Sequence, residues 1–213
     1  MKIERIHITF FVVIAALVWW ATLAYQDTPV TWEHAKPFTI VVSALGVLWL
    51  IFDHRLWRNP YLHGWFFKRP DLRGTWRVEL QSSFKSKSGE RVPMIVCYMG
   101  VEQTLSELKM HLMTPESASC SIASHIRPSP SGKGYQAIFV YTNEPNIHLR
   151  DGRTSLIHKG ALIINTHGSG VRPDTLTAEY WTDRDTVGTM DFNNRVDEVF
   201  TRFADAKQHF EQS

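Results

Sequence analysis

The stretch GTWRVELQSS, at residues 74–83, decides the fold class because apolar and polar side chains alternate along it. Trp76, Val78 and Leu80 fall on one face, as in a strand that turns one side toward a core. Runs of the same kind follow, separated by turn segments such as SKSGER and PSPSGKG. Strands are expected at about residues 74–83, 93–104, 107–114, 117–126, 135–143, 156–165, 176–184 and 186–196. Such a series predicts an antiparallel barrel or sandwich.

Eight strands favour a barrel whose interior is filled by side chains or holds one small ligand. After the last run, residues 197–212 change to a helical period, with Val199, Phe200, Phe203 and Phe210 roughly on one stripe. The sequence therefore predicts a closing helix that packs on the barrel.

Two apolar runs precede the barrel. Residues 6–25 contain no Asp, Glu, Lys or Arg, and about 20 helical residues are enough to cross a hydrocarbon core of roughly 30 Å. The second run, residues 38–52, is shorter and reaches Trp57 if Arg55 extends its charge toward the headgroups. Because the connection at residues 26–36 is short and polar, the two runs predict a transmembrane hairpin.

The expected fold class is an α+β membrane protein, in which an N-terminal two-helix transmembrane hairpin precedes an eight-stranded antiparallel β-barrel with a C-terminal helix. We expect an anchor at residues 1–57, an interfacial basic and aromatic linker at 58–73, and the barrel at 74–213. Two alternatives stay open. The first run could be a cleaved signal peptide, with Thr22 and Ala24 before the cut, and the second run could be a buried core helix.

Basic residues beside the apolar runs predict the orientation. Lys2 and Arg5 precede the first run, and Lys36 is the only Lys or Arg in the connection. Six further Lys and Arg residues follow the second run, between residues 55 and 77. Both termini are therefore expected on the cytoplasmic side.

The charge distribution argues against a nucleic-acid polymer as a partner. Residues 1–77 carry nine Lys/Arg and five Asp/Glu, whereas the rest carry fourteen and sixteen, so the strand-rich part has no polycationic face. Cys97 and Cys120 lie far apart on different runs, which favours two buried thiols over a disulfide. Zinc-site spacings and the Walker A, HExxH and G-x-S-x-G patterns are absent from the sequence. We therefore expect no catalytic residue, no metal site and no cofactor.

Several short motifs carry a family resemblance. Two apolar runs are followed by PDLRGTW at residues 70–76, and then by VEQT, alternating serines, YTNEP, HKG and EYWTDRDTVG at residues 101–104, 117–121, 141–145, 158–160 and 179–188. In this order the motifs resemble the two-transmembrane β-barrel effectors of bacterial cyclic-oligonucleotide-based anti-phage signalling (CBASS), over essentially the whole chain.

The resemblance implies a function. A cognate nucleotidyltransferase would make a cyclic dinucleotide, which the barrel would bind in the cytoplasm. The chain would then form a homo-oligomer, and the helices would act on membrane lipid and disrupt the bacterial inner membrane. On this reading both termini are cytoplasmic and the protein is not an enzyme.

Candidate ligand-binding residues follow from the period of the strands. Tyr180 and Thr182 share a face with Arg184, so that Tyr180 could stack on a base and Arg184 could pair with a phosphate. Arg184 could instead form a surface ion pair with Asp183 or Asp185.

Tyr141 and Asn143 share a face with Ala137 and Phe139, and Asn143 has the donor and acceptor needed to read a base edge. Asn143 could equally make an Asx-type turn before Pro145.

His158 lies on the face of Leu162 and Ile164, as a ligand contact or as a buried, hydrogen-bonded histidine. Gln103, Ser119 and Ser121 could line the cavity or face water.

Trp76 has two interpretations, as a ligand contact and as a plug. Gly74-Thr75-Trp76 resembles the G-x-W that opens lipocalin-like barrels, in which the Trp closes one end and an Arg from a late strand packs on it. Arg195 or Arg184 could serve here. The chain could thus be a membrane-tethered, lipocalin-like binder of an apolar ligand. A third hypothesis is an enzyme that acts on lipid or nucleotide substrates.

Overall fold

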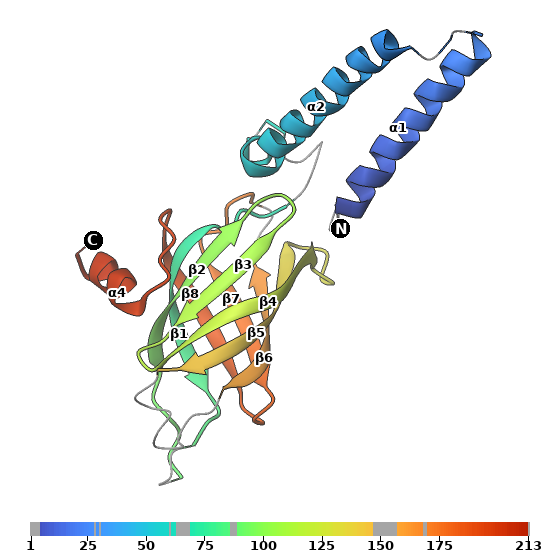
Figure 1. Ribbon diagram of the computed structural model, residues 1–213. Helices are drawn as coiled ribbons and strands as arrows, with labels where there is room; N and C mark the ends of the chain where they lie inside the picture. The colour runs from blue at the N-terminus through green and yellow to red at the C-terminus, as the bar shows by residue number, and fades with distance from the viewer. Residues whose placement is uncertain are drawn as a thin grey trace. The chain divides into compact units, whose positions relative to one another are not determined.

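The computed structural model describes residues 5–27, 29, 31–59, 61–62, 69–85, 89–146, 157–167 and 170–212. The chain divides into two compact units. One is helical and comprises residues up to 59 together with 104–106, and the other contains a β-barrel (Figure 1).

In the helical unit, α1 (Arg5–Tyr25) covers the first apolar run as predicted, and α2 (Trp32–His54) covers the second. The short helix η1 (Leu56–Arg58) follows. The predicted connection at 26–36 is too long, because α2 begins at Trp32 and includes Lys36. Most large apolar side chains described in the second run are exposed: Leu45, Val47, Leu48, Leu50 and Ile51. This exposure does not support a buried core helix within the chain.

A search of the described residues finds no helix that is both long enough and apolar enough to cross a membrane. Of the predicted interfacial linker at 58–73, residues 60 and 63–68 lie outside the described part of the chain.

The barrel is closed by eight antiparallel strands in simple up-and-down order, with β1 pairing to both β2 and β8 (Figure 1). The strands are β1 (Gly74–Ser82), β2 (Ile95–Gln103), β3 (Leu108–Met113), β4 (Ser117–Pro128), β5 (Tyr135–Pro145), β6 (His158–Thr166), β7 (Leu176–Thr182) and β8 (Val187–Val196). All eight predicted strands are confirmed, and each terminus lies within two residues of its predicted place.

The up-and-down order gives the barrel two distinct ends. The linker end is where β1 begins, next to residues 69–73, and the distal end is where β1 finishes at Ser82. Inward positions alternate along the strands, apart from register shifts in the β4–β5 and β1–β8 pairs. They fill the interior with large side chains that include Trp76, Met99, Phe139 and Phe192. Trp76 and Phe192 meet edge to face, with ring centroids 6.2 Å apart. The linker half of the interior is therefore a packed core.

An irregularity in β4 changes how its serines are used. The β4–β5 register shifts between Ser121 and Ala123, and backbone pairing between β3 and β4 covers only His111–Met113. Beyond that ladder the Ser121 hydroxyl accepts a hydrogen bond from the Met110 N–H at 2.9 Å, and the Ser124 hydroxyl donates to Leu108 O. These two serines thus join β3 to β4 within the barrel wall.

The C-terminal helix α4 (Phe203–Gln212) packs on the outside of β2 and β3, where it forms a second small core with Tyr98 and Met113. Tyr98 stacks on Phe210 with ring centroids 5.2 Å apart. The predicted helix is confirmed, but it begins six residues later than expected, since Val199 and Phe200 precede it. Phe200 O lies so close to Gly100 that any larger residue there would collide with it.

The two cysteines are free, and they differ in exposure. Cys97 is buried on an inward position of β2, and burial raises the pKa of its thiol to about 12. Cys120 is exposed, so the prediction of a second buried thiol is wrong. The reason is the period of β4, which turns Ser119 and Ser121 inward and Cys120 outward.

Candidate functional site

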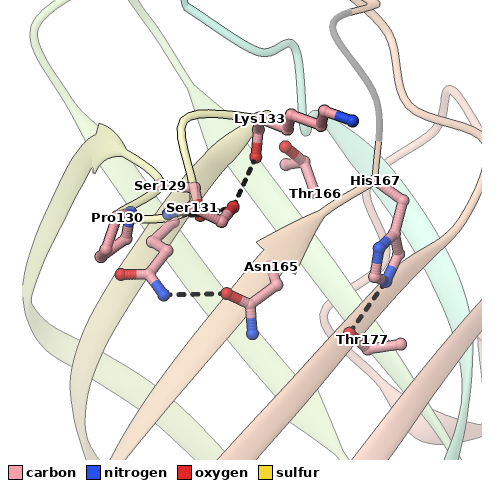
Figure 2. A pocket seen from close by; sticks show the side chains of 9 residues that line it. Ser129, Pro130, Ser131, Lys133, Asn165, Thr166, His167 and Thr177 are labelled. Carbon is pink, nitrogen blue, oxygen red and sulfur yellow. Dashed lines mark hydrogen bonds between the residues drawn. The ribbon is translucent and has the colours of Figure 1, made fainter.

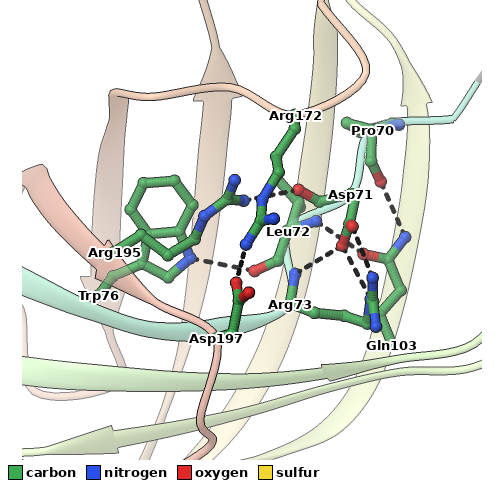
Figure 3. Close-up of polar contacts among 9 residues, drawn as sticks. All are labelled: Pro70, Asp71, Leu72, Arg73, Trp76, Gln103, Arg172, Arg195 and Asp197. Carbon is green, nitrogen blue, oxygen red and sulfur yellow. Dashed lines mark hydrogen bonds and ion pairs between the residues drawn. The ribbon is translucent and has the colours of Figure 1, made fainter. Parts of the chain in front are cut away.

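The linker end is closed by the segment that enters β1. Gln103, the last residue of β2, accepts a hydrogen bond from the Leu72 N–H at 2.9 Å and donates one to Pro70 O at 2.9 Å. The Trp76 indole N–H donates to Leu72 O at 3.0 Å, and the Asp71 N–H donates to Val171 O at 2.7 Å. These bonds, shown in part in Figure 3, fix the entering segment across the barrel end.

Charged side chains complete this closure (Figure 3). The Arg195 guanidinium lies 4.7 Å from the Trp76 ring centroid and donates to Asp71 O at 2.9 Å. Burial, together with the neighbouring charge of Arg172, lowers the pKa of Arg195 to about 10, so it still carries its charge at neutral pH. Arg172 in turn forms an ion pair with Asp197.

Asp71 binds Arg73 through both carboxylate oxygens, at 2.9 and 2.7 Å. Although burial alone would raise the pKa of Asp71, the hydrogen bonds and charge of Arg73 outweigh it and lower that pKa. The carboxylate is therefore ionised across the physiological range.

Trp76 is a plug, as the lipocalin-like interpretation predicts, and Arg195 is the arginine that packs on it. Gln103 lies at the same end, with both ends of its amide occupied by the backbone of residues 70 and 72. Trp76 and Gln103 therefore lie apart from the other predicted ligand contacts.

Six of the predicted site residues meet on the inner face of the distal end. Strand pairing sets Ser119, Asn143 and His158 side by side on β4, β5 and β6. The next row inward contains Tyr141 and Thr182, with Gly160 between them. Tyr180 lies on the adjacent level of β7. We call these six residues, Ser119, Tyr141, Asn143, His158, Tyr180 and Thr182, the distal cluster.

Asn143 is an inward residue of β5 and not part of a turn, because β5 continues to Pro145. Its side-chain oxygen accepts a hydrogen bond from the Ser119 hydroxyl at 2.9 Å, and both side chains are buried. The oxygen has a second lone pair and the amide N–H groups are donors, so Asn143 can offer an acceptor and a donor to a ligand. His158 is half-buried at the start of β6.

Two glycines position the tyrosine rings. A β-carbon at Gly160 would collide with the ring and hydroxyl of Tyr141, and one at Gly188 would collide with the ring of Tyr180. The hydroxyl end of Tyr141 and the ring of Tyr180 therefore each lie close to the backbone of a neighbouring strand. Burial raises the pKa of Tyr141, and it also raises that of Tyr180, although a hydrogen bond with Ser82 opposes the second shift. Both phenols are neutral hydrogen-bonding groups at physiological pH.

The inner face of the distal end is uncharged as far as the structure describes it. Among the inward positions that the structure describes there, from Leu80 and Ser82 on β1 to Gly188 on β8, no side chain is Lys, Arg, Asp or Glu. Aromatic faces, hydroxyls and one amide remain. Such a surface can hold a flat polar ring by stacking and by hydrogen bonds between neutral groups.

Arg184 is not on this inner face. Strand β7 ends at Thr182, and the exposed Arg184 lies in the turn that leads to β8. The Thr182 hydroxyl lies 2.6 Å from the Thr186 hydroxyl and accepts a hydrogen bond from the Arg184 N–H at 3.2 Å, which fixes the turn. The predicted shared face therefore stops at Thr182. Ser121 faces inward as well, but its hydroxyl is bonded within the wall.

A polar pocket that the sequence reading missed lies on the outer wall at the linker end (Figure 2). Gln136 donates to Asn165 at 2.9 Å, and His167 is 2.9 Å from the Thr177 hydroxyl. The β4–β5 turn, including Ser129 and Lys133, borders it. None of the predicted ligand residues lines this pocket. Its only signal in the sequence is the set of outward polar positions on three consecutive strands.

The antiparallel barrel is closed, it is plugged at one end, and it carries neutral polar and aromatic side chains inside the other end. This is the architecture of a small-molecule receptor.

Comparison with known protein families gives the family of the chain. Residues 67–194, more than half of the 213-residue chain, match the model described as "Cap15, cyclic dinucleotide receptor domain". The chain belongs to this family. No curated protein matches the chain.

Proposed function

We propose that this protein is an anti-phage effector whose barrel binds a cyclic dinucleotide at the distal cluster. The ligand class comes from the Cap15 receptor family. The location is supported by one observation: Tyr141, Asn143 and Tyr180 meet on one inner surface, at the end of the barrel that Trp76 does not plug, and the described side chains of that surface are uncharged.

The chemistry of the distal cluster suits the nucleobases of such a ligand. A base would stack on a tyrosine ring, since base–aromatic stacking tolerates any base, and the Asn143 amide would donate to a base edge. The phosphates, in contrast, need cationic or N–H donors. Because the described inner face is neutral, the bases would point into the barrel and the phosphates would remain near its rim, where Arg184 is exposed.

The membrane part of the proposal comes from the sequence. The run at residues 6–25 lacks charged side chains, and the second run supplies exposed Leu and Val side chains in α2. Ligand binding would favour an assembly-competent state if that state binds the ligand more tightly. The assembled helices would then disrupt the bacterial inner membrane, with both termini in the cytoplasm.

Isothermal titration calorimetry of the full chain in detergent tests the binding site, with cyclic di-AMP, cyclic di-GMP, cyclic GMP–AMP and cyclic di-UMP as probes. We expect one of them to bind and Asn143→Leu to weaken binding by about tenfold, the equivalent of one lost hydrogen bond. Asn165→Leu, which changes an outward amide at the linker end, is the matched control. Lack of heat with every probe would refute the receptor proposal.

The topology is tested by reporters fused after Ser213. A cytoplasmic reporter should be active and a periplasmic one silent, and the reverse would place the barrel beyond the reach of a cytoplasmic nucleotide. Leakage of dye from liposomes that contain the full chain then tests membrane disruption. We expect leakage to depend on the cyclic dinucleotide and to fall with Asn143→Leu.

A lipocalin-like binder of an apolar ligand is the second candidate, because the stacking of Arg195 on Trp76 is the plug that such barrels use. Mass spectrometry of the protein purified without added nucleotide separates the two. A copurified lipid in stoichiometric amount favours the apolar ligand.

A further inference from the structure

An exposed row of apolar side chains crosses the outer wall of the barrel. Val140 on β5, Ala161 on β6, Trp181 on β7 and Val187 on β8 are direct neighbours in the strand register. Their side chains point outward, and Val140, Trp181 and Val187 are 39%, 46% and 54% exposed. Four adjacent strands at a spacing of about 4.8 Å make this row roughly 14 Å wide. Contiguous apolar surface of this kind marks an interaction site more often than scattered apolar residues do.

The row is complementary to itself. A two-fold axis parallel to the strands, placed between β6 and β7, exchanges Ala161 with Trp181 and Val140 with Val187. The large indole of one copy would then face the methyl group of Ala161 in the other, and valine would face valine. Self-complementarity is the requirement for an interface between two identical subunits.

The charged pair on the distal side of the row obeys the same symmetry, whereas Glu179 on the linker side would face Ile163 of the other copy. Lys159 and Asp183 are register neighbours one step toward the distal end. The Asp183 N–H donates to Lys159 O at 3.0 Å, and the Lys159 N–H donates to the Asp183 carboxylate at 3.1 Å. Both are exposed, and the same axis places the lysine of one copy opposite the aspartate of the other. A lipid surface would not require this pairing of opposite charges.

We propose that the Val140–Ala161–Trp181–Val187 row is the surface through which two copies of this chain associate. The inference deepens the self-association part of the proposed function and names the residues that perform it. Trp181 is the central anchor, since a large aromatic residue seated against a small one is typical of the energetic centre of an interface.

Cross-linking of mixed variants tests the geometry. One full-length population carries Val140→Cys and the other Val187→Cys, both with the exposed Cys120 changed to Ser, and a bis-maleimide with a spacer of about 10 Å matches the separation of facing sheets. We expect covalent dimers in the mixture and few in either variant alone, because each position is offset laterally by about 14 Å from its own symmetry copy, in addition to the separation of about 10 Å between the facing sheets. Ile122→Cys mixed with Val187→Cys is the control, since Ile122 is 61% exposed but lies outside the row.

Equal cross-linking in the control mixture, or in the single variants, would overturn the inference. As an independent measurement, Trp181→Ser should shift the sedimentation of the full chain toward the monomer, and unchanged sedimentation would also overturn it. Binding of the cyclic dinucleotide is measured on the same samples. If the cyclic dinucleotide binds but the Val140–Val187 cross-links do not form, the association surface is refuted and the receptor proposal stands. If the cross-links form but no cyclic dinucleotide binds, the receptor proposal is refuted and the association surface stands.

Discussion

Gln103→Met would separate a structural role of this residue from a ligand-binding one. The substitution keeps the length of the side chain and removes both of its hydrogen bonds, which leaves the Leu72 N–H and Pro70 O buried without these partners. An unsatisfied buried polar group costs about 1–3 kcal/mol, so the barrel should lose about 3 kcal/mol of unfolding free energy. At a urea m-value of about 2 kcal/mol per molar, the unfolding midpoint should fall by about 1.5 M.

Urea unfolding of the full chain, followed by near-ultraviolet circular dichroism, measures this shift. Gln136→Met is the matched control, because Gln136 also makes side-chain hydrogen bonds but lies half-buried on the outer wall. It should change the unfolding free energy by less than about 0.5 kcal/mol. Affinity for the cyclic dinucleotide, measured where Gln103→Met is folded, should equal that of the unsubstituted chain. Equal midpoints for the two variants, or a loss of affinity in Gln103→Met alone, would refute the reasoning.

Three further predictions concern the linker end and the cysteines. Arg195→Met removes the cation over Trp76 and one hydrogen bond, so it should lower the unfolding free energy by about 2 kcal/mol, as measured by urea unfolding. An unchanged unfolding free energy would show that Arg195 does not stabilise the plug. Asp71 has a lowered pKa, so its contribution to stability is complete above the unfolded-state value of about 3.9 and disappears as the pH falls through the folded value. Asp71→Asn should therefore flatten the stability profile below about pH 4, and an unchanged profile there would contradict the assignment. Iodoacetamide at pH 8 should label Cys120 within minutes and leave Cys97 unmodified in the folded protein, as read by peptide mass spectrometry; equal labelling would show that the Cys97 strand opens readily.

The period of each run was enough to predict all eight strands. Alternation in GTWRVELQSS and its counterparts survives in the structure because most strands have a core on one side only, although β2 and β3 also pack on α4 through Tyr98 and Met113. The start of α4 could not be predicted in the same way. Val199 and Phe200 fit a helical stripe, yet Phe200 lies before the helix, where its N–H bonds the Thr75 hydroxyl and its ring contacts the second core. The position of Phe200 outside the helix thus depends on contacts with residues more than a hundred positions away in the sequence.

The sequence predicted which side chains of the candidate site face the interior of the barrel, but not at which end of the barrel each of them lies. Period two correctly places Tyr141, Asn143 and Tyr180 inside the barrel. Trp76 and Gln103 also lie inside, although the sequence left Gln103 either lining the cavity or facing water. Which end each residue occupies depends on strand direction and register, which a single run does not contain. The error at Arg184 has a different cause, since the strand ends two residues earlier, where the Thr182 and Thr186 hydroxyls close the turn.

Pairing of β1 with β8 leaves the sheet without a free edge. Unpaired backbone N–H and C=O groups of an edge strand are the template on which amyloid-like stacking grows, and a closed sheet has no edge strand. The closed sheet thus protects the protein against spontaneous fibre growth, even where many copies of the chain are close together. Contact between copies has to be specified by side chains, so it can be strengthened or abolished by single substitutions without any change in the backbone.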